Sequence, residues 1–305
     1  MRGEAFSDPS KTQEMPEGWQ RRPVKHAPPL EDADLVVILN QQIYAAFLPI
    51  MQEYAEDHGI KIAVGEGTCG IAAGALARKE ADIGSFCCPP GETDRLPGLR
   101  FHTLGIMPIA LVAHPENPLD GITMAQAQEI FQGLIYRWSE VRDSQGRPGK
   151  DVPILTIGRL HCKLRPGHWR LLLDDEDLFS ARLQEVESIP DMISLVAADQ
   201  KAIGYEVPWM LRQYRDEGRV KILKVDGLDP RNLEHLVSGD YPLYRTFSVT
   251  TWEGEGVGNP RARELVEHLL NEVERLGEKF GIAPASRLRQ AGWKFNGDEL
   301  VGEPR

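Results

Sequence analysis

The feature that most constrains the fold is a regular alternation of apolar segments within residues 34–84. Strand-length apolar runs at 34–40, 60–64 and 81–84 are separated by two segments, 44–58 and 71–79, that read as helices. The order strand, helix, strand, helix, strand is typical of a sheet with parallel strands, because each helix returns the chain to the same edge. The sequence therefore predicts an α/β fold.

Later segments continue this pattern. Strands are predicted at 101–113, 152–157, 202–207 and 220–225, and helices at 123–131, 165–183 and 260–280. The helix at 260–280 is the clearest, because it is amphipathic and is followed by Gly281, a residue that commonly ends helices. Residues 1–33 contain five prolines and little periodicity, which predicts a flexible lead-in.

Charge and hydropathy exclude several classes of protein. The net charge of −11 opposes general binding to nucleic acid or anionic lipid, and no apolar run approaches the ~20 residues that span a bilayer. Residues 1–29 contain no apolar core of a secretory signal. The protein is therefore intracellular, or a signal peptide has been removed.

Five segments, in order along the chain, carry a resemblance to a known family. They are ADIG at 81–84, HPENPLDG at 114–121, IFQG with RWSEV at 130–141, AIGY at 202–205 and SGDYPLYR at 238–245. Together they resemble the phosphate-binding proteins, the periplasmic solute receptors of ABC importers.

The resemblance implies a two-lobed periplasmic-binding-protein-like α/β fold with a ligand cleft between the lobes and hinge closure on binding. The implied domains are a flexible lead-in at 1–33, lobe 1 at 34–108 plus 212–290, lobe 2 at 110–208 and a tail at 291–305. It also implies a periplasmic or extracytoplasmic location and a partner permease or sensor kinase. No catalytic motif is present, so we expect a binding protein rather than an enzyme.

The four loops that bind phosphate in the resembling family are rich in serine and threonine, but here they carry other residues. The predicted ligand-binding residues are Gln41, Gln42, Thr68, Cys69, Gly70, Ser85, Cys87, Cys88, Arg159, His161, Cys162 and Lys163. All four cysteines of the chain fall in three of these loops. A thiol is a weak hydrogen-bond donor, whereas a thiolate binds soft ions strongly.

The cysteines therefore predict a thiophilic ligand, either arsenite or a soft transition metal ion. The candidate metal ligands are Cys69, Cys87, Cys88, Cys162 and His161. No cofactor is otherwise expected. Two alternatives stay open: an oxyanion receptor with incidental thiols, and a thiol redox protein that uses a pair such as Cys69–Cys162 or Cys87–Cys88.

Overall fold

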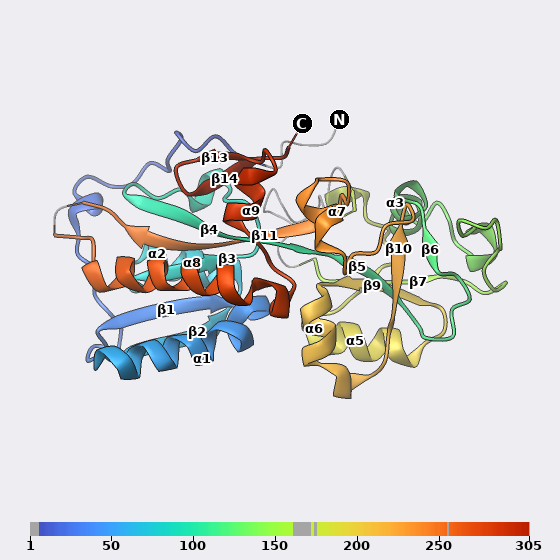
Figure 1. The fold of residues 1–305 in the computed structure, drawn as a ribbon, viewed down its shortest axis with the longest axis horizontal. Helices are drawn as coiled ribbons and strands as arrows, with labels where there is room; N and C mark the ends of the chain where they lie inside the picture. The colour runs from blue at the N-terminus through green and yellow to red at the C-terminus, as the bar shows by residue number, and fades with distance from the viewer. Residues whose placement is uncertain (1–5, 161–171, 174–175, 255, 305) are drawn as a thin grey trace. The chain divides into compact units, whose positions relative to one another are not determined.

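The computed structural model describes residues 6–160, 172–173, 176–254 and 256–304. The chain forms two compact units, which we call the first unit (Phe6–Ile106 with Thr246–Arg305) and the second unit (Met107–Arg245). Each contains a six-stranded sheet with helices (Figure 1). The chain passes between the units within two long strands, β4 (Leu99–Pro108) and β11 (Tyr244–Trp252).

The sheet of the first unit has the strand order β12-β4-β11-β3-β1-β2. Strand β1 is parallel to β2 and to β3, whereas β11 is antiparallel to β3. Its other strands are β1 (Leu35–Asn40), β2 (Ile62–Gly67), β3 (Ile83–Phe86) and β12 (Ala283–Pro284), and a hairpin of β13 (Lys294–Asn296) and β14 (Glu299–Gly302) follows. The predicted strand–helix alternation of residues 34–84 is confirmed.

Four helices lie in the described part of the first unit, and three of them begin at a side-chain cap. They are α1 (Gln41–His58), α2 (Cys69–Ala77), α8 (Pro260–Phe280) and α9 (Ala285–Gln290), with short 3-10 turns at Trp19–Arg21 and Glu92–Asp94. The Asn40 side chain caps α1, the Thr68 side chain caps α2, and Gly281 ends α8 in the left-handed region at φ 75°. The helix predicted at 260–280 is confirmed.

The sheet of the second unit has the order β6-β10-β5-β9-β7-β8. Its strands are β5 (Ala110–Ala113), β6 (Gly121–Ile122), β7 (Leu155–Gly158), β8 (Gln184–Glu185), β9 (Ala202–Glu206) and β10 (Lys221–Val225). Its described helices include α3 (Met124–Gln132), α5 (Ile189–Ala198), α6 (Pro208–Gln213) and α7 (Leu233–Val237), and short 3-10 turns lie at Trp138–Glu140, Glu176–Leu178 and Arg215–Glu217. Ala110, Val112, Ile157 and Met192 form part of its buried core.

Two details differ from the sequence prediction. Residues 212–245 belong to the second unit, because β10 pairs with β5 and β6 there, whereas the prediction assigned them to the first lobe. The helix predicted at 165–183 falls largely outside the described residues, and its described end contains only the 3-10 turn Glu176–Leu178 followed by loop. No helix among the described residues is long and apolar enough to cross a membrane.

The N-terminal segment, expected to be a flexible lead-in, packs onto the first unit from Phe6 onward. Trp19 is only 4% exposed, donates its indole N–H to the Ala77 carbonyl at 3.1 Å and meets the Trp252 ring edge-on at 5.8 Å. The ammonium of Lys79 lies between the two rings, 4.5 Å from the centre of Trp19 and 3.4 Å from that of Trp252. Burial lowers the pKa of Lys79 to about 8.

We predict that Trp19→Ala lowers the free energy of unfolding by about 3 kcal/mol, because it removes a buried indole and leaves a cavity beside Lys79. Urea denaturation followed by circular dichroism measures this change. Glu17→Ala, at an exposed position in the same segment, is the matched control and should change stability by less than about 0.5 kcal/mol. Equal, small effects of both substitutions would show that the segment contributes little to the folded unit.

Candidate functional site at the carboxyl edge of the first sheet

Three chain segments meet at the carboxyl edge of the parallel strands in the first unit. In the β1–β3 register Ile38 lies opposite Gly84, and in the β1–β2 register Asn40 lies opposite Gly67. The loops that follow these strands are therefore neighbours. They are the start of α1, the start of α2 and the segment 87–90, and such an edge is the usual ligand-binding position in α/β sheets.

Asn40, the last residue of β1, connects the starts of α1 and α2 with strand β3. Its backbone N–H donates to the Ser85 hydroxyl at 2.5 Å, its side-chain oxygen accepts the Gln42 N–H at 3.0 Å, and its side-chain amide donates to the Cys69 sulfur at 3.7 Å. Asn40 ends the strand predicted at 34–40 and was not among the predicted ligand-binding residues. Its position between a buried strand and a helix was the available signal.

Three of the predicted cysteines lie together. The sulfurs of Cys69 and Cys87 are 3.3 Å apart, and the Cys69 sulfur also accepts the Cys87 backbone N–H at 3.2 Å. Hydrogen bonds with Cys69 and Cys87, together with burial, raise the pKa of Cys88 well above its ordinary value. All three are thiols rather than disulfides and are buried, at 0%, 4% and 2% exposure in sequence order.

A glycine allows this close approach of α2 to β3. A Cβ atom on Gly84 would lie 2.6 Å from one methyl carbon of Leu76, and 3.5 Å from the Cβ of Ala72. Because Gly84 has no side chain, α2 packs directly against β3, and its first residue, Cys69, reaches the residues that follow the strand. The predicted ADIG segment thus has a packing role that positions the thiols.

The remaining predicted residues of these loops have structural contacts of their own. Thr68 caps α2 by accepting the Ile71 N–H at 3.3 Å, and Ser85 is fully buried beneath Asn40. Gln41 and Gln42 form the first positions of α1, where Gln42 is buried, and Gly70 is exposed. The structure therefore brings most of the predicted first-unit residues to one edge, and the thiols are at its centre.

Arg159, predicted from the same family pattern, lies in the second unit at the end of β7. Its guanidinium forms an ion pair with Glu206 at 2.9 Å, with side chains 7% and 3% exposed. Its backbone N–H donates to the Tyr205 hydroxyl at 3.1 Å. Glu206 directly follows the AIGY segment and was not predicted as a site residue. The charge of Arg159 is thus balanced within the protein.

His161, Cys162 and Lys163 lie outside the described residues, so their predicted roles stay predictions. Among residues that the structure does describe, no group of three or more His, Cys, Asp or Glu side chains is arranged to hold a metal ion. The described thiols therefore do not form a ready-made metal site.

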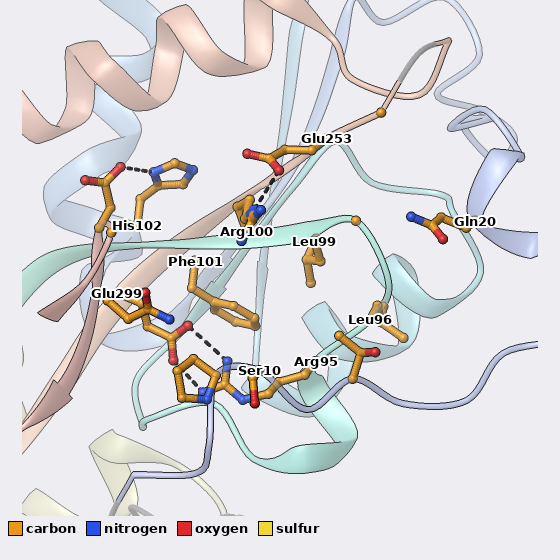
Figure 2. Close-up of a pocket in the computed structure, with 17 residues that line it drawn as sticks. Ser10, Gln20, Arg95, Leu96, Leu99, Arg100, Phe101, His102, Glu253 and Glu299 are labelled. Atoms are coloured by element: carbon orange, nitrogen blue, oxygen red, sulfur yellow. Dashed lines mark hydrogen bonds and ion pairs between the residues drawn. The ribbon is translucent and has the colours of Figure 1, made fainter.

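A pocket of about 670 Å³ lies at the opposite edge of the same sheet (Figure 2). It is lined by the start of β4, by Glu253 just after β11, by the N-terminal segment and by the β13–β14 turn. Two ion pairs border it, Arg95 with Glu299 and Arg100 with Glu253, together with a contact between the His102 ring and the Asp298 carboxylate, as the dashed lines show. The charged side chains that line the pocket are therefore engaged with one another.

The two α/β units, their two strand crossings and the loops at the carboxyl edge define a two-lobed binding-protein fold. The model of the PBP superfamily domain matches residues 32–272, and the chain belongs to this superfamily.

Solved structures show the same fold. A putative phosphate ABC transporter substrate-binding protein with bound phosphate from Clostridium perfringens is 19% identical with a TM-score of 0.70, and covers 82% of this chain and 99% of its own. An ABC-type phosphate transport receptor from Vibrio cholerae is 19% identical with a TM-score of 0.65, at 82% and 100% coverage. A possible phosphate binding protein from Planctomyces limnophilus DSM 3776 is 17% identical with a TM-score of 0.52, at 84% and 98% coverage.

We predict that Asn40→Ala lowers the free energy of unfolding by about 1 kcal/mol, because α1 loses its cap. Asn40→Asp is the matched variant: a carboxylate oxygen also caps the helix, so stability should stay close to that of the natural chain. Thermal and urea unfolding of the three proteins measure these changes. If Asn40→Asp is destabilised as much as Asn40→Ala, the contacts of the side-chain amide matter more than the cap.

Proposed function

We propose that this chain is a solute receptor that takes a thiophilic species, arsenite or a soft transition metal ion, onto Cys69, Cys87 and Cys88. The observation that carries the proposal is the contact of the three sulfurs at the ligand-binding edge, with 3.3 Å between the Cys69 and Cys87 sulfurs. A set of thiols is a strong ligand for soft ions and a poor one for hard oxyanions. Membership of the PBP superfamily supports the receptor part of the proposal.

The structural neighbours are described as phosphate receptors, so phosphate is the natural competing ligand. Two features of this chain disfavour it. The Arg159 guanidinium is paired with the buried Glu206 carboxylate, and an incoming phosphate would have to compete with that partner. At the carboxyl edge of the first sheet, thiols occupy positions where hydroxyl groups would be stronger donors to an oxyanion.

The proposed activity is capture and release without a chemical change of the solute. In an extracytoplasmic compartment, an importer permease or a sensor kinase would bind the receptor in its ligand-bound state. These parts of the proposal rest on the fold and the family. The ligand itself rests on the cysteines.

Calorimetry of the reduced protein with arsenite, copper(I), zinc and phosphate tests the ligand class. We expect binding of at least one thiophile, no comparable binding of phosphate, and a loss of at least about tenfold in thiophile affinity for Cys69→Ser, or about 1.4 kcal/mol. Ala75→Ser, which adds a hydroxyl to the buried side of the same helix, is the control and should keep the affinity. Tight phosphate binding that survives Cys69→Ser would contradict the proposal and favour an oxyanion receptor.

The same sulfur contact favours one second candidate, a thiol redox protein. A disulfide needs about 2.05 Å between sulfurs, so Cys69 and Cys87 would have to approach by only about 1.3 Å. The sequence suggested the pairs Cys69–Cys162 and Cys87–Cys88. The pair in contact, Cys69–Cys87, takes one cysteine from each of them. An oxidant that removes one hydrogen from each of the two thiols would join their sulfurs in a disulfide.

We predict that a stoichiometric peroxide treatment removes two of the four thiols, measured with a chromogenic thiol reagent and by a mass loss of two hydrogens. Cys88→Ser should still lose two thiols, because Cys69 and Cys87 remain. The Cys69→Ser variant should lose no thiols by disulfide formation between positions 69 and 87, because one of the two sulfurs is absent. Four thiols that persist in the oxidant-treated natural chain would end the redox candidate.

A further inference from the structure

The N-terminal segment contacts the residues that follow the thiols. The Ser7 hydroxyl donates to the Pro90 carbonyl at 2.5 Å and accepts the Arg95 Nε–H at 2.9 Å. The same guanidinium donates to both carboxylate oxygens of Glu299, at 3.0 and 2.5 Å, as the dashed lines of Figure 2 show. Pro90 lies two residues after Cys88. A chain of hydrogen bonds therefore runs from the start of β14 through Arg95 and Ser7 to the thiol-bearing segment.

The backbone between the thiols and Pro90 has little freedom of its own. Cys88 is followed by Pro89 and Pro90, whose rings fix their φ angles, and a residue that precedes a proline is restricted toward extended conformations. Residues 87–91 are all buried, so the Pro90 carbonyl needs a donor from within the protein, and Ser7 provides one. A displacement of Pro90 is consequently passed on to Cys88 rather than absorbed between the two residues.

The part of the N-terminal segment that holds Pro90 is attached by polar contacts. None of residues 7–18 is buried, and the backbone N–H of Gln13 donates to the Arg95 carbonyl at 2.7 Å. The first buried side chain is that of Trp19, and Gly18 directly before it has a left-handed backbone with φ 77°. Segments with little buried apolar surface open at a lower free-energy cost than a packed core. Residues 7–18 can therefore detach while Trp19 stays packed.

We propose that residues 7–18 form a strap that controls access to the thiols of the candidate site. While Ser7 holds the Pro90 carbonyl, Cys88 stays buried; when the strap detaches, Pro90 loses this donor and the segment that carries the thiols moves toward solvent. The inference concerns regulation of the proposed site and rests on the proposed function for the identity of the solute. The strap precedes the family match, which begins at residue 32, so the gate is an addition to the matched domain.

Alkylation of the reduced full-length protein with iodoacetamide, followed by mass spectrometry, measures how often Cys88 is exposed. Ser7→Ala removes the hydroxyl and should raise the alkylation rate of Cys88 about tenfold, because a buried carbonyl loses its donor. Ser7→Thr keeps a hydroxyl and should stay within about threefold of the natural rate. Ser10→Ala is the matched control, because Ser10 is exposed and its hydroxyl donates to Asp8 within the strap. It should leave the alkylation rate unchanged.

Two further measurements separate gating from unfolding of the whole first unit. Because Trp19 stays packed when the strap detaches, Trp19→Ala should accelerate hydrogen exchange in α8, which reports unfolding of the unit, but should keep Cys88 alkylation within about threefold of the natural rate. In the natural chain, the Gln13 amide and the Cys88 thiol should give the same opening equilibrium once each rate is divided by that of an unstructured peptide. This comparison uses the natural protein alone, so it decides the question even if Ser7→Ala does not fold.

Three results would overturn the inference. They are equal alkylation of Cys88 in Ser7→Ala and Ser10→Ala, acceleration of Cys88 alkylation by Trp19→Ala to the same degree as exchange in α8, and an opening equilibrium at Gln13 more than about tenfold larger than at Cys88. In the last case the strap would open without exposing the thiol. All three leave the proposed receptor standing, whereas a reduced chain that binds no thiophile defeats the proposed function but not the gating of thiols toward iodoacetamide.

Discussion

The parallel pairing of β1 with β2 and β3 is the constraint on which the candidate site depends. Parallel strands end at the same edge, so the residues after three strands become neighbours although they are far apart in sequence. Asn40 then joins the starts of α1 and α2 to strand β3 through one backbone and two side-chain hydrogen bonds. The close packing of α2 on Gly84 completes the arrangement, because it brings the first residue of that helix to the end of β3.

The two units bury different kinds of side chain at the positions predicted to bind a ligand. In the second unit, Arg159 and Glu206 form a buried ion pair, whose mutual attraction offsets part of the cost of removing both charges from water. In the first unit, three thiols lie at the carboxyl edge of the sheet, and they cost little to bury because a thiol is only weakly polar. This chain thus differs from the phosphate-binding pattern expected from its sequence in two ways: Arg159, predicted to contact a ligand, is paired within the protein, and thiols occupy predicted ligand positions in the first unit.

The sequence was sufficient for local features and insufficient for several long-range ones. The alternation of residues 34–84 predicted the parallel strands, and Gly281 marked the end of α8. The assignment of β10 failed because a strand's apolar pattern does not say which sheet it joins. Its pairing with β5 depends on contacts between distant parts of the chain.

In the candidate site, too, local positions could be predicted from the sequence but long-range contacts could not. The loop positions of Cys69, Cys87 and Cys88 followed from the motifs, but their mutual contact depends on helix packing that periodicity does not reveal. The N-terminal segment looked irregular because it has no repeating apolar pattern. It is held instead by single anchors, among them Trp19 and a hydrogen bond from Ser7 to the Pro90 carbonyl.

The position of Trp19 shows that the folded first unit extends beyond the segment matched by the family model. The family match begins at residue 32, but Trp19 covers Lys79, which lies well inside that match. A fragment trimmed to the family boundaries would leave this ammonium facing water on one side. Its proton affinity would then rise from the buried value of about 8 toward that of an ordinary lysine. The titration of Lys79 would therefore differ between the full chain and a fragment that lacks Trp19.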